Sequence, residues 1–147
     1  LMAPIFSKDS EDTKIAIDKL QQFINTFPQS EFNDDANELI FELDYRLELK
    51  EFNIALQYNV LTDYQAAIKS FENFLIDFPG SDLREKAMYY RFDSAYKLAI
   101  NSVVWKQRER IENAVSYFNS FKNSYYDSEL MDEMESKLSE LSEINNI

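Results

Sequence analysis

The chain has 147 residues, which allows one domain or one run of repeats at the usual size of roughly 100–200 residues per domain. Histidine and cysteine are absent and glycine occurs once, which excludes thiol nucleophiles, histidine bases, disulfides, common zinc sites and glycine-rich phosphate loops. A net charge of −12 repels nucleic-acid phosphates. We therefore expect a non-catalytic protein with no cofactor, no metal and no nucleic-acid partner.

The composition also predicts an all-α fold with a real core. Apolar residues make up 45% of the chain, and 12 Phe, 9 Tyr and 1 Trp supply ample area to bury. One Gly and three Pro are too few for the frequent tight turns of a sandwich or barrel. No apolar stretch approaches the ~18–20 residues of a transmembrane helix.

A segment near the start of the chain recurs twice. Ala16–Ser30 aligns with Ala67–Ser81 at an offset of 51, and again with Ala114–Ser128 at an offset of 47, where Tyr126 replaces the proline. In each copy the apolar residues follow the i, i+4, i+7, i+11 spacing of one buried helix face. Each copy therefore predicts a helix, a short turn and the start of a second helix. The predicted core positions are Ala16, Leu20, Phe23, Ile24 and Phe27, then Ala67, Phe71, Phe74, Leu75 and Phe78, then Ala114, Phe118, Phe121 and Tyr125.

In chain order, the pattern predicts helices at 12–27, 31–61, 64–78, 82–101, 108–125 and 128–144. The pattern favours one long second helix, and a kink in it near Lys50 is the alternative. Asn101–Gln107 breaks the periodicity and is interpreted as a loop between antiparallel helices. The last helix ends in polar residues, as the terminal cap of a repeat array does. The N-caps expected for the second, fourth and sixth helices are Ser30, Ser81 and Ser128.

The charge is distributed unevenly. Arg84–Arg110 carries seven basic and three acidic residues, whereas the rest of the chain is strongly acidic. Trp105 lies in the predicted loop beside cations, a composition typical of an interface hot spot. The basic cluster is interpreted as a contact for an acidic partner surface or for lipid headgroups. Intramolecular ion pairing, and Trp105 folding back onto its own helices, are the competing interpretations. The candidate partner-binding residues are Arg91, Tyr96, Asn101, Ser102, Trp105, Lys106, Arg108 and Arg110.

The spacing of Tyr58, Tyr64, Ala67, Phe71 and Pro79 matches the tetratricopeptide repeat. The match predicts a superhelix of antiparallel helix pairs in a single repeat domain over 1–147, with copies near 12–61, 64–101 and 108–144.

A narrower resemblance comes from the order of motifs along the chain. The motifs are Thr13–Ile24, Phe27–Ser30, Ala55–Tyr58, Tyr64–Ile68, Phe78–Ser81, Leu98–Ser102 and Lys106–Arg110. With these motifs the chain resembles the BamD family of outer-membrane β-barrel assembly lipoproteins, in its Bacteroidetes-type form. The resemblance implies the C-terminal portion of a five-repeat protein, held at the periplasmic face of the outer membrane by a lipid anchor upstream of this segment.

The same resemblance implies a function and partners. It indicates a scaffold that docks to the periplasmic POTRA region of a BamA-like protein, with other assembly subunits and unfolded outer-membrane proteins as further partners. The alternative is a generic tetratricopeptide adaptor that binds peptide segments in its concave groove. An enzyme is the weakest hypothesis, because only a carboxylate or lysine mechanism would remain.

Overall fold

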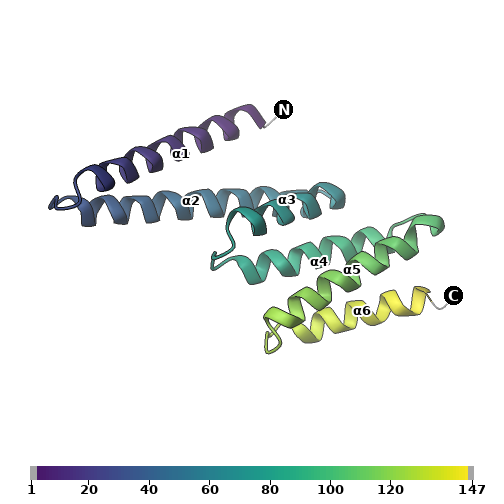
Figure 1. Cartoon of the computed structure of the whole chain (residues 1–147). Coiled ribbons are helices and arrows are strands. Elements are labelled where there is room, and N and C mark those ends of the chain that lie inside the picture. Colours follow the sequence, from purple (N-terminus) through teal and green to yellow (C-terminus); the bar gives the residue numbers. More distant parts are fainter. Residues whose placement is uncertain (1–2, 146–147) are drawn as a thin grey trace. The chain divides into compact units, whose positions relative to one another are not determined.

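The computed structural model describes residues 3–145, with side chains from residue 10 onward, and this part of the chain is helical without strands (Figure 1). The all-α, tetratricopeptide-like fold expected from the sequence is confirmed. The six helices are α1 (Ala3–Thr26), α2 (Asn33–Val60), α3 (Tyr64–Asp77), α4 (Arg84–Ile100), α5 (Val104–Ser124) and α6 (Met131–Asn145).

Two helices begin earlier than predicted. Helix α1 starts at Ala3 rather than near residue 12, and Pro4 lies in its first turn, where a helix tolerates proline. Helix α5 starts at Val104, so the predicted loop Asn101–Gln107 is wrong and only 101–103 connects α4 to α5. Val103 has the extended backbone of an N-cap, with φ −62° and ψ 148°. The first turn of α5 is exposed, so it has no apolar periodicity by which the sequence could reveal it.

Contacts divide the chain into two compact units, Leu1–Lys50 and Glu51–Ile147. The boundary falls within α2, which is assigned as one helix from Asn33 to Val60. In the first unit α1 lies beside the first part of α2 (Figure 1). The turn between them is closed by the side-chain amide of Asn33, which donates to the Phe27 carbonyl at 2.8 Å.

The second unit has a continuous apolar interior. The end of α2 packs against α3 and the start of α4, where the rings of Phe52 and Phe71 meet edge-on with centroids 5.8 Å apart. A larger cluster fills the space between α4, α5 and α6, with Phe92, Phe118 and Met134 at its centre. The predicted stripes of α3 and α5 lie in these clusters, as the repeat pattern requires.

The prediction that the three serines after the repeated motif are helix N-caps is wrong. Each hydroxyl instead accepts a hydrogen bond from the backbone N–H two residues later, at 3.2 Å for Ser30 and 3.1 Å for Ser81 and Ser128. The N-cap of α4 is Leu83, which makes no side-chain cap bond. The serines therefore close a short turn ahead of α2, α4 and α6, because hydroxyls favour such local backbone bonds.

Candidate protein-docking site

The turn between α4 and α5 is held rigidly by its own polar side chains. The Asn101 amide donates to the Lys97 carbonyl at 2.8 Å, and the Ser102 hydroxyl donates to the Leu98 carbonyl at 2.5 Å. From α5, the Arg110 guanidinium donates to the Ser102 hydroxyl at 2.6 Å. Three of the predicted contact residues, Asn101, Ser102 and Arg110, therefore connect α4 to α5.

The first turn of α5 presents apolar side chains to solvent. Trp105 is 81% exposed, Val104 is 83% exposed, and the preceding Val103 is 46% exposed. Trp105 is thus a helical residue rather than a loop residue, and it does not fold back onto its own helices. An exposed tryptophan flanked by exposed valines has the composition of a contact surface, because aromatic side chains are enriched at interfaces.

The basic residues of this region are largely engaged within the chain. Arg108 forms an exposed ion pair with Glu112 at 3.2 Å, and Lys97 pairs with Asp93 at 2.8 Å. Lys106 is exposed and has no ion pair within residues 10–145. The surface around Trp105 therefore combines exposed apolar side chains with two exposed cations, Lys106 and Arg108, of which Arg108 is ion-paired.

Arg91 and Tyr96 lie on faces of α4 that pack against other helices. The Arg91 guanidinium stacks over the Tyr117 ring of α5, 4.3 Å from its centroid, and burial lowers the pKa of Arg91. The Tyr96 hydroxyl donates to Glu140 of α6, and its ring stacks with Phe92. These two residues orient α4 relative to α5 and α6, which fixes where the α4–α5 turn lies.

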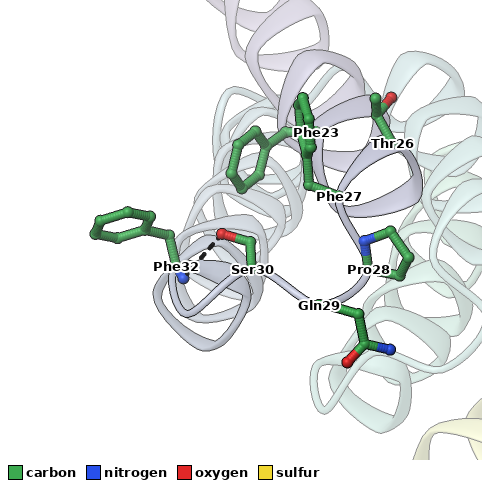
Figure 2. Close-up of a pocket in the computed structure, with 7 residues that line it drawn as sticks. All are labelled: Phe23, Thr26, Phe27, Pro28, Gln29, Ser30 and Phe32. Carbon is green, nitrogen blue, oxygen red and sulfur yellow. Dashed lines mark hydrogen bonds between the residues drawn. The ribbon is translucent and has the colours of Figure 1, made fainter.

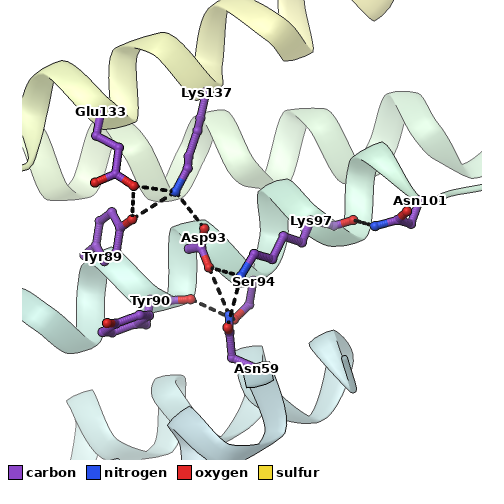
Figure 3. A network of polar contacts seen from close by, with 9 residues as sticks. All are labelled: Asn59, Tyr89, Tyr90, Asp93, Ser94, Lys97, Asn101, Glu133 and Lys137. Atoms are coloured by element: carbon purple, nitrogen blue, oxygen red, sulfur yellow. Dashed lines mark hydrogen bonds and ion pairs between the residues drawn. The ribbon is translucent and has the colours of Figure 1, made fainter. Parts of the chain in front are cut away.

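A polar network that the sequence reasoning missed joins α2, α4 and α6 (Figure 3). Asp93 is only 3% exposed, and its carboxylate accepts from Lys97, Lys137 and the Asn59 amide. The Asn59 amide also donates to Ser94 at 2.7 Å. The sequence feature that indicates this network is the acidic residue Asp93, which shares a helix face with Tyr89 and Tyr96, the face that contacts α6.

The network controls the charge of its members. Burial alone would raise the pKa of Asp93, but the hydrogen bonds from Lys97 and Lys137 outweigh it and hold that pKa below its ordinary value. Burial and the hydrogen bond to Glu133 raise the pKa of Tyr89 to about 12. Burial opposes the charge on Lys137, but its bonds to Tyr89, Asp93 and Glu133 raise the pKa of its ammonium. Asp93 therefore stays ionised and paired, so it serves structure rather than acid–base chemistry.

An open apolar hollow lies at the α1–α2 turn of the first unit (Figure 2). Its walls include the rings of Phe23 and Phe27, which meet with centroids 5.4 Å apart, and Phe32. Phe27 and Phe32 are both more than half exposed. Aromatic walls around an open hollow suit an apolar side chain of a bound peptide.

The described residues, 3–145, offer neither a cluster of metal ligands nor a membrane-spanning helix. Within 3–145, no group of three or more acidic side chains converges in a way that could hold a metal ion. No helix in that range combines the length and hydrophobicity needed to cross a bilayer. The surface around Trp105 is the feature with the clearest binding character.

Comparison with known proteins identifies a family whose model matches this chain. The model of the family YfiO, described as outer membrane lipoprotein, matches residues 3–105, which run from the start of α1 through the turn after α4 to Trp105. No curated protein matches the chain. The family match covers more than half of the chain.

Proposed function

The chain belongs to this outer membrane lipoprotein family, and from this premise we propose that it is a non-catalytic scaffold that docks to the periplasmic POTRA region of a BamA-like protein. The family corresponds to the BamD-type lipoproteins that the motifs resemble, and it assigns the protein to outer-membrane protein assembly at the periplasmic face of the outer membrane. The chain contains no cysteine, so an acylated cysteine is not among its 147 residues.

The finer parts of the resemblance belong to the same proposal. The chain is the C-terminal portion of a Bacteroidetes-type protein of this family, folded as one repeat domain over 1–147. Other assembly subunits and unfolded outer-membrane proteins are its further partners. The repeat copies on α3 and α5, both buried in the second unit, support a scaffold role because stacked repeats present rigid surfaces.

The observation that carries the docking proposal is the 81% exposure of Trp105 in the first turn of α5, next to a hydrogen-bonded α4–α5 turn. In this proposal Trp105, Lys106 and Arg108 contact the partner directly, whereas Asn101, Ser102 and Arg110 hold the turn. Arg91 and Tyr96 position α4 behind it. Pre-organised turns favour binding, because less freedom is lost when the partner docks.

Surface plasmon resonance against the purified POTRA region tests the proposal. We expect Trp105→Ala to raise the Kd at least about 30-fold, mainly through faster dissociation, as for an anchor worth at least ~2 kcal/mol. Lys106→Glu should slow association and change its salt dependence.

A matched control is available in the second unit. Tyr126 is 77% exposed and lies in the turn between α5 and α6, at the opposite end of α5 from Trp105. Tyr126→Ala should bind as the unchanged chain does. Equal loss of binding in Trp105→Ala and Tyr126→Ala, or loss in neither, would contradict docking at the α4–α5 turn.

The hollow at the α1–α2 turn favours a second candidate function, an adaptor for peptide segments. In that case Phe27→Ser and Phe32→Ser would reduce peptide binding, whereas Trp105→Ala would not. Fluorescence anisotropy with labelled peptides that end in an aromatic residue distinguishes this function from scaffold docking.

A further inference from the structure

Exposed apolar side chains of the second unit gather at two turns. Six of the eight large apolar side chains that are exposed in residues 51–145 lie at the α2–α3 turn or the α4–α5 turn. The two remaining ones, Ile76 and Tyr126, lie near the α3–α4 and α5–α6 turns. The six are Tyr58, Val60, Leu61, Val103, Val104 and Trp105.

The α2–α3 turn presents two of these side chains on a fixed backbone. Val60 is 71% exposed and Leu61 is 65% exposed. The N–H of Thr62 donates to the Asn59 carbonyl at 3.1 Å, and the N–H of Asp63 donates to the Tyr58 carbonyl at 3.0 Å. This pair of bonds is the Schellman pattern that ends helices. It fixes the backbone from which the Val60 and Leu61 side chains project.

The turn also contains backbone strain. Thr62 has φ 66°, in the left-handed region where a helix normally ends on Gly or Asn. A β-branched residue is an outlier there, because its side chain crowds the backbone. Strain of this kind persists where the surrounding structure enforces it, and it concentrates at functional sites. The outlier directly follows the two exposed apolar residues.

The two turns lie at the same end of the second unit. Asn59, in the last turn of α2, bonds to Ser94 and Lys97 in the last two turns of α4. The C-terminal ends of α2 and α4 are thereby held together, and α3 and α5 both run back from that end (Figure 1). A single partner surface can reach both turns.

We infer that the α2–α3 turn, through Val60 and Leu61, is a second contact point for the partner that docks on Trp105. The inference rests on the proposed function and extends it to a partner surface with two apolar patches. The partner is a protein that places a carboxylate opposite Lys106 and a cation opposite Asp63.

The charged side chains near the two turns favour a protein over a lipid bilayer as the partner that binds them. Asp63 is exposed beside Leu61, and Glu109 is exposed one turn after Trp105. These carboxylates, together with the chain's net charge of −12, are repelled by anionic lipid headgroups. Opposite charges at the two turns, Asp63 at one and Lys106 at the other, instead match a protein surface with complementary charges.

The test measures binding of the 147-residue chain to the purified POTRA region by surface plasmon resonance. We expect the double variant Val60→Ser/Leu61→Ser to raise the Kd by about 5- to 30-fold, because two apolar side chains lose their contact. Both residues are exposed, so the variant should keep the unchanged chain's circular dichroism spectrum. The matched control is Ile76→Ser, because Ile76 is 74% exposed on α3 but lies far along that helix from the turn.

The outcomes separate this inference from the proposed function. Weaker binding by the double variant and by Trp105→Ala, with Ile76→Ser unchanged, supports both. If Trp105→Ala weakens binding but the double variant does not, the second contact point is wrong and the docking proposal stands. If neither variant weakens binding, or the unchanged chain does not bind, both are wrong.

A second experiment, with lipid vesicles, tests whether a membrane and not a protein binds the two turns. Trp105 is the single tryptophan of the chain, so its emission reports on this end of the second unit without a label. Vesicles of phosphatidylethanolamine and phosphatidylglycerol should leave that emission unchanged. A blue shift that the double variant abolishes would assign both turns to the membrane and overturn the inference.

Discussion

Helices α1, α3 and α5 carry the same repeated motif but differ in how far it is buried. Ala67, Phe71 and Phe74 of α3 are at most 1% exposed, and the matching residues of α5 are at most 5% exposed. In α1 the matching Ala16 and Phe23 are only half-buried, and Phe27 is 56% exposed. The motif thus specifies a helix and its apolar face, whereas burial requires neighbours on both sides of that helix.

The difference follows from what each helix contacts. Helix α3 lies between the end of α2 and α4, and α5 lies between α4 and α6. In the first unit α1 lies beside the first part of α2 (Figure 1). Of the described side chains in residues 10–50, only Ser10, Ala36 and Leu47 are buried. Equivalent substitutions in the two units should therefore have unequal effects on stability.

The largest expected effect is on equivalent phenylalanines. Phe71→Ala should lower the free energy of unfolding by about 3–5 kcal/mol, because it empties a fully buried position. Phe23→Ala, at the matching position of α1, should lower it by about 1 kcal/mol, since that side chain is only partly buried. Urea denaturation followed by far-UV circular dichroism measures both. Equal losses would show that the first unit has a core like that of the second.

A smaller difference in stability is expected between substitutions of the two alanines that precede these phenylalanines in the repeated motif. Ala67 is fully buried where helices meet, so Ala67→Leu should overpack the second unit and cost about 1–3 kcal/mol. Ala16→Leu should change stability by no more than about 0.5 kcal/mol, because solvent is available to the added methyl groups. Thermal melts of the two variants provide the measurement, and a matching drop in Tm for Ala16→Leu would contradict the expectation.

The buried charge of the second unit should make its stability depend on pH. The pKa of Asp93 is below its ordinary value of 3.8, so its ion pairs contribute stability above that pH and lose it as the pH falls through the lowered value. Urea titrations at pH 7 and at pH 3 should show this loss. Asp93→Asn should be less stable at pH 7 and change less between the two pH values, whereas the exposed Glu135→Gln should behave like the unchanged chain.

The smallest effect is expected at the strained turn. Thr62→Gly should raise the free energy of unfolding by about 0.5–1 kcal/mol, because glycine adopts the left-handed conformation without crowding. Thr13→Gly, inside α1, should lower it by about 0.3–0.5 kcal/mol through poorer helix propensity. Opposite signs for the same substitution would confirm the strain, whereas a loss of stability in both variants would argue against it.

Several features could be predicted from the sequence because they depend on neighbouring residues alone. The repeated stripe from Ala67 to Phe78 predicted α3 and its buried face, and the absence of Gly and Pro over 31–61 predicted a long second helix. The sequence places Ser30, Ser81 and Ser128 between helices but does not distinguish a turn from a helix cap, since a hydroxyl can serve either equally well. The start of α5 could not be predicted, because its first apolar residues, Val104 and Trp105, are exposed and form no buried stripe.

Tertiary structure alone decided which side chains remain available for binding. The sequence determined that basic residues cluster over Arg84–Arg110, but folding pairs Lys97 and Arg108 with acidic side chains, stacks Arg91 on Tyr117, and leaves Val103, Val104 and Trp105 exposed. Folding likewise places Asp93 beside Lys137, which lies 44 residues later in the chain. Local periodicity records which face of a helix is apolar, whereas partners across helices are set by packing between distant segments. That is why the helices and the candidate contact residue Trp105 could be read from the sequence, whereas the packing partners of Arg91, Tyr96 and Asp93 could not.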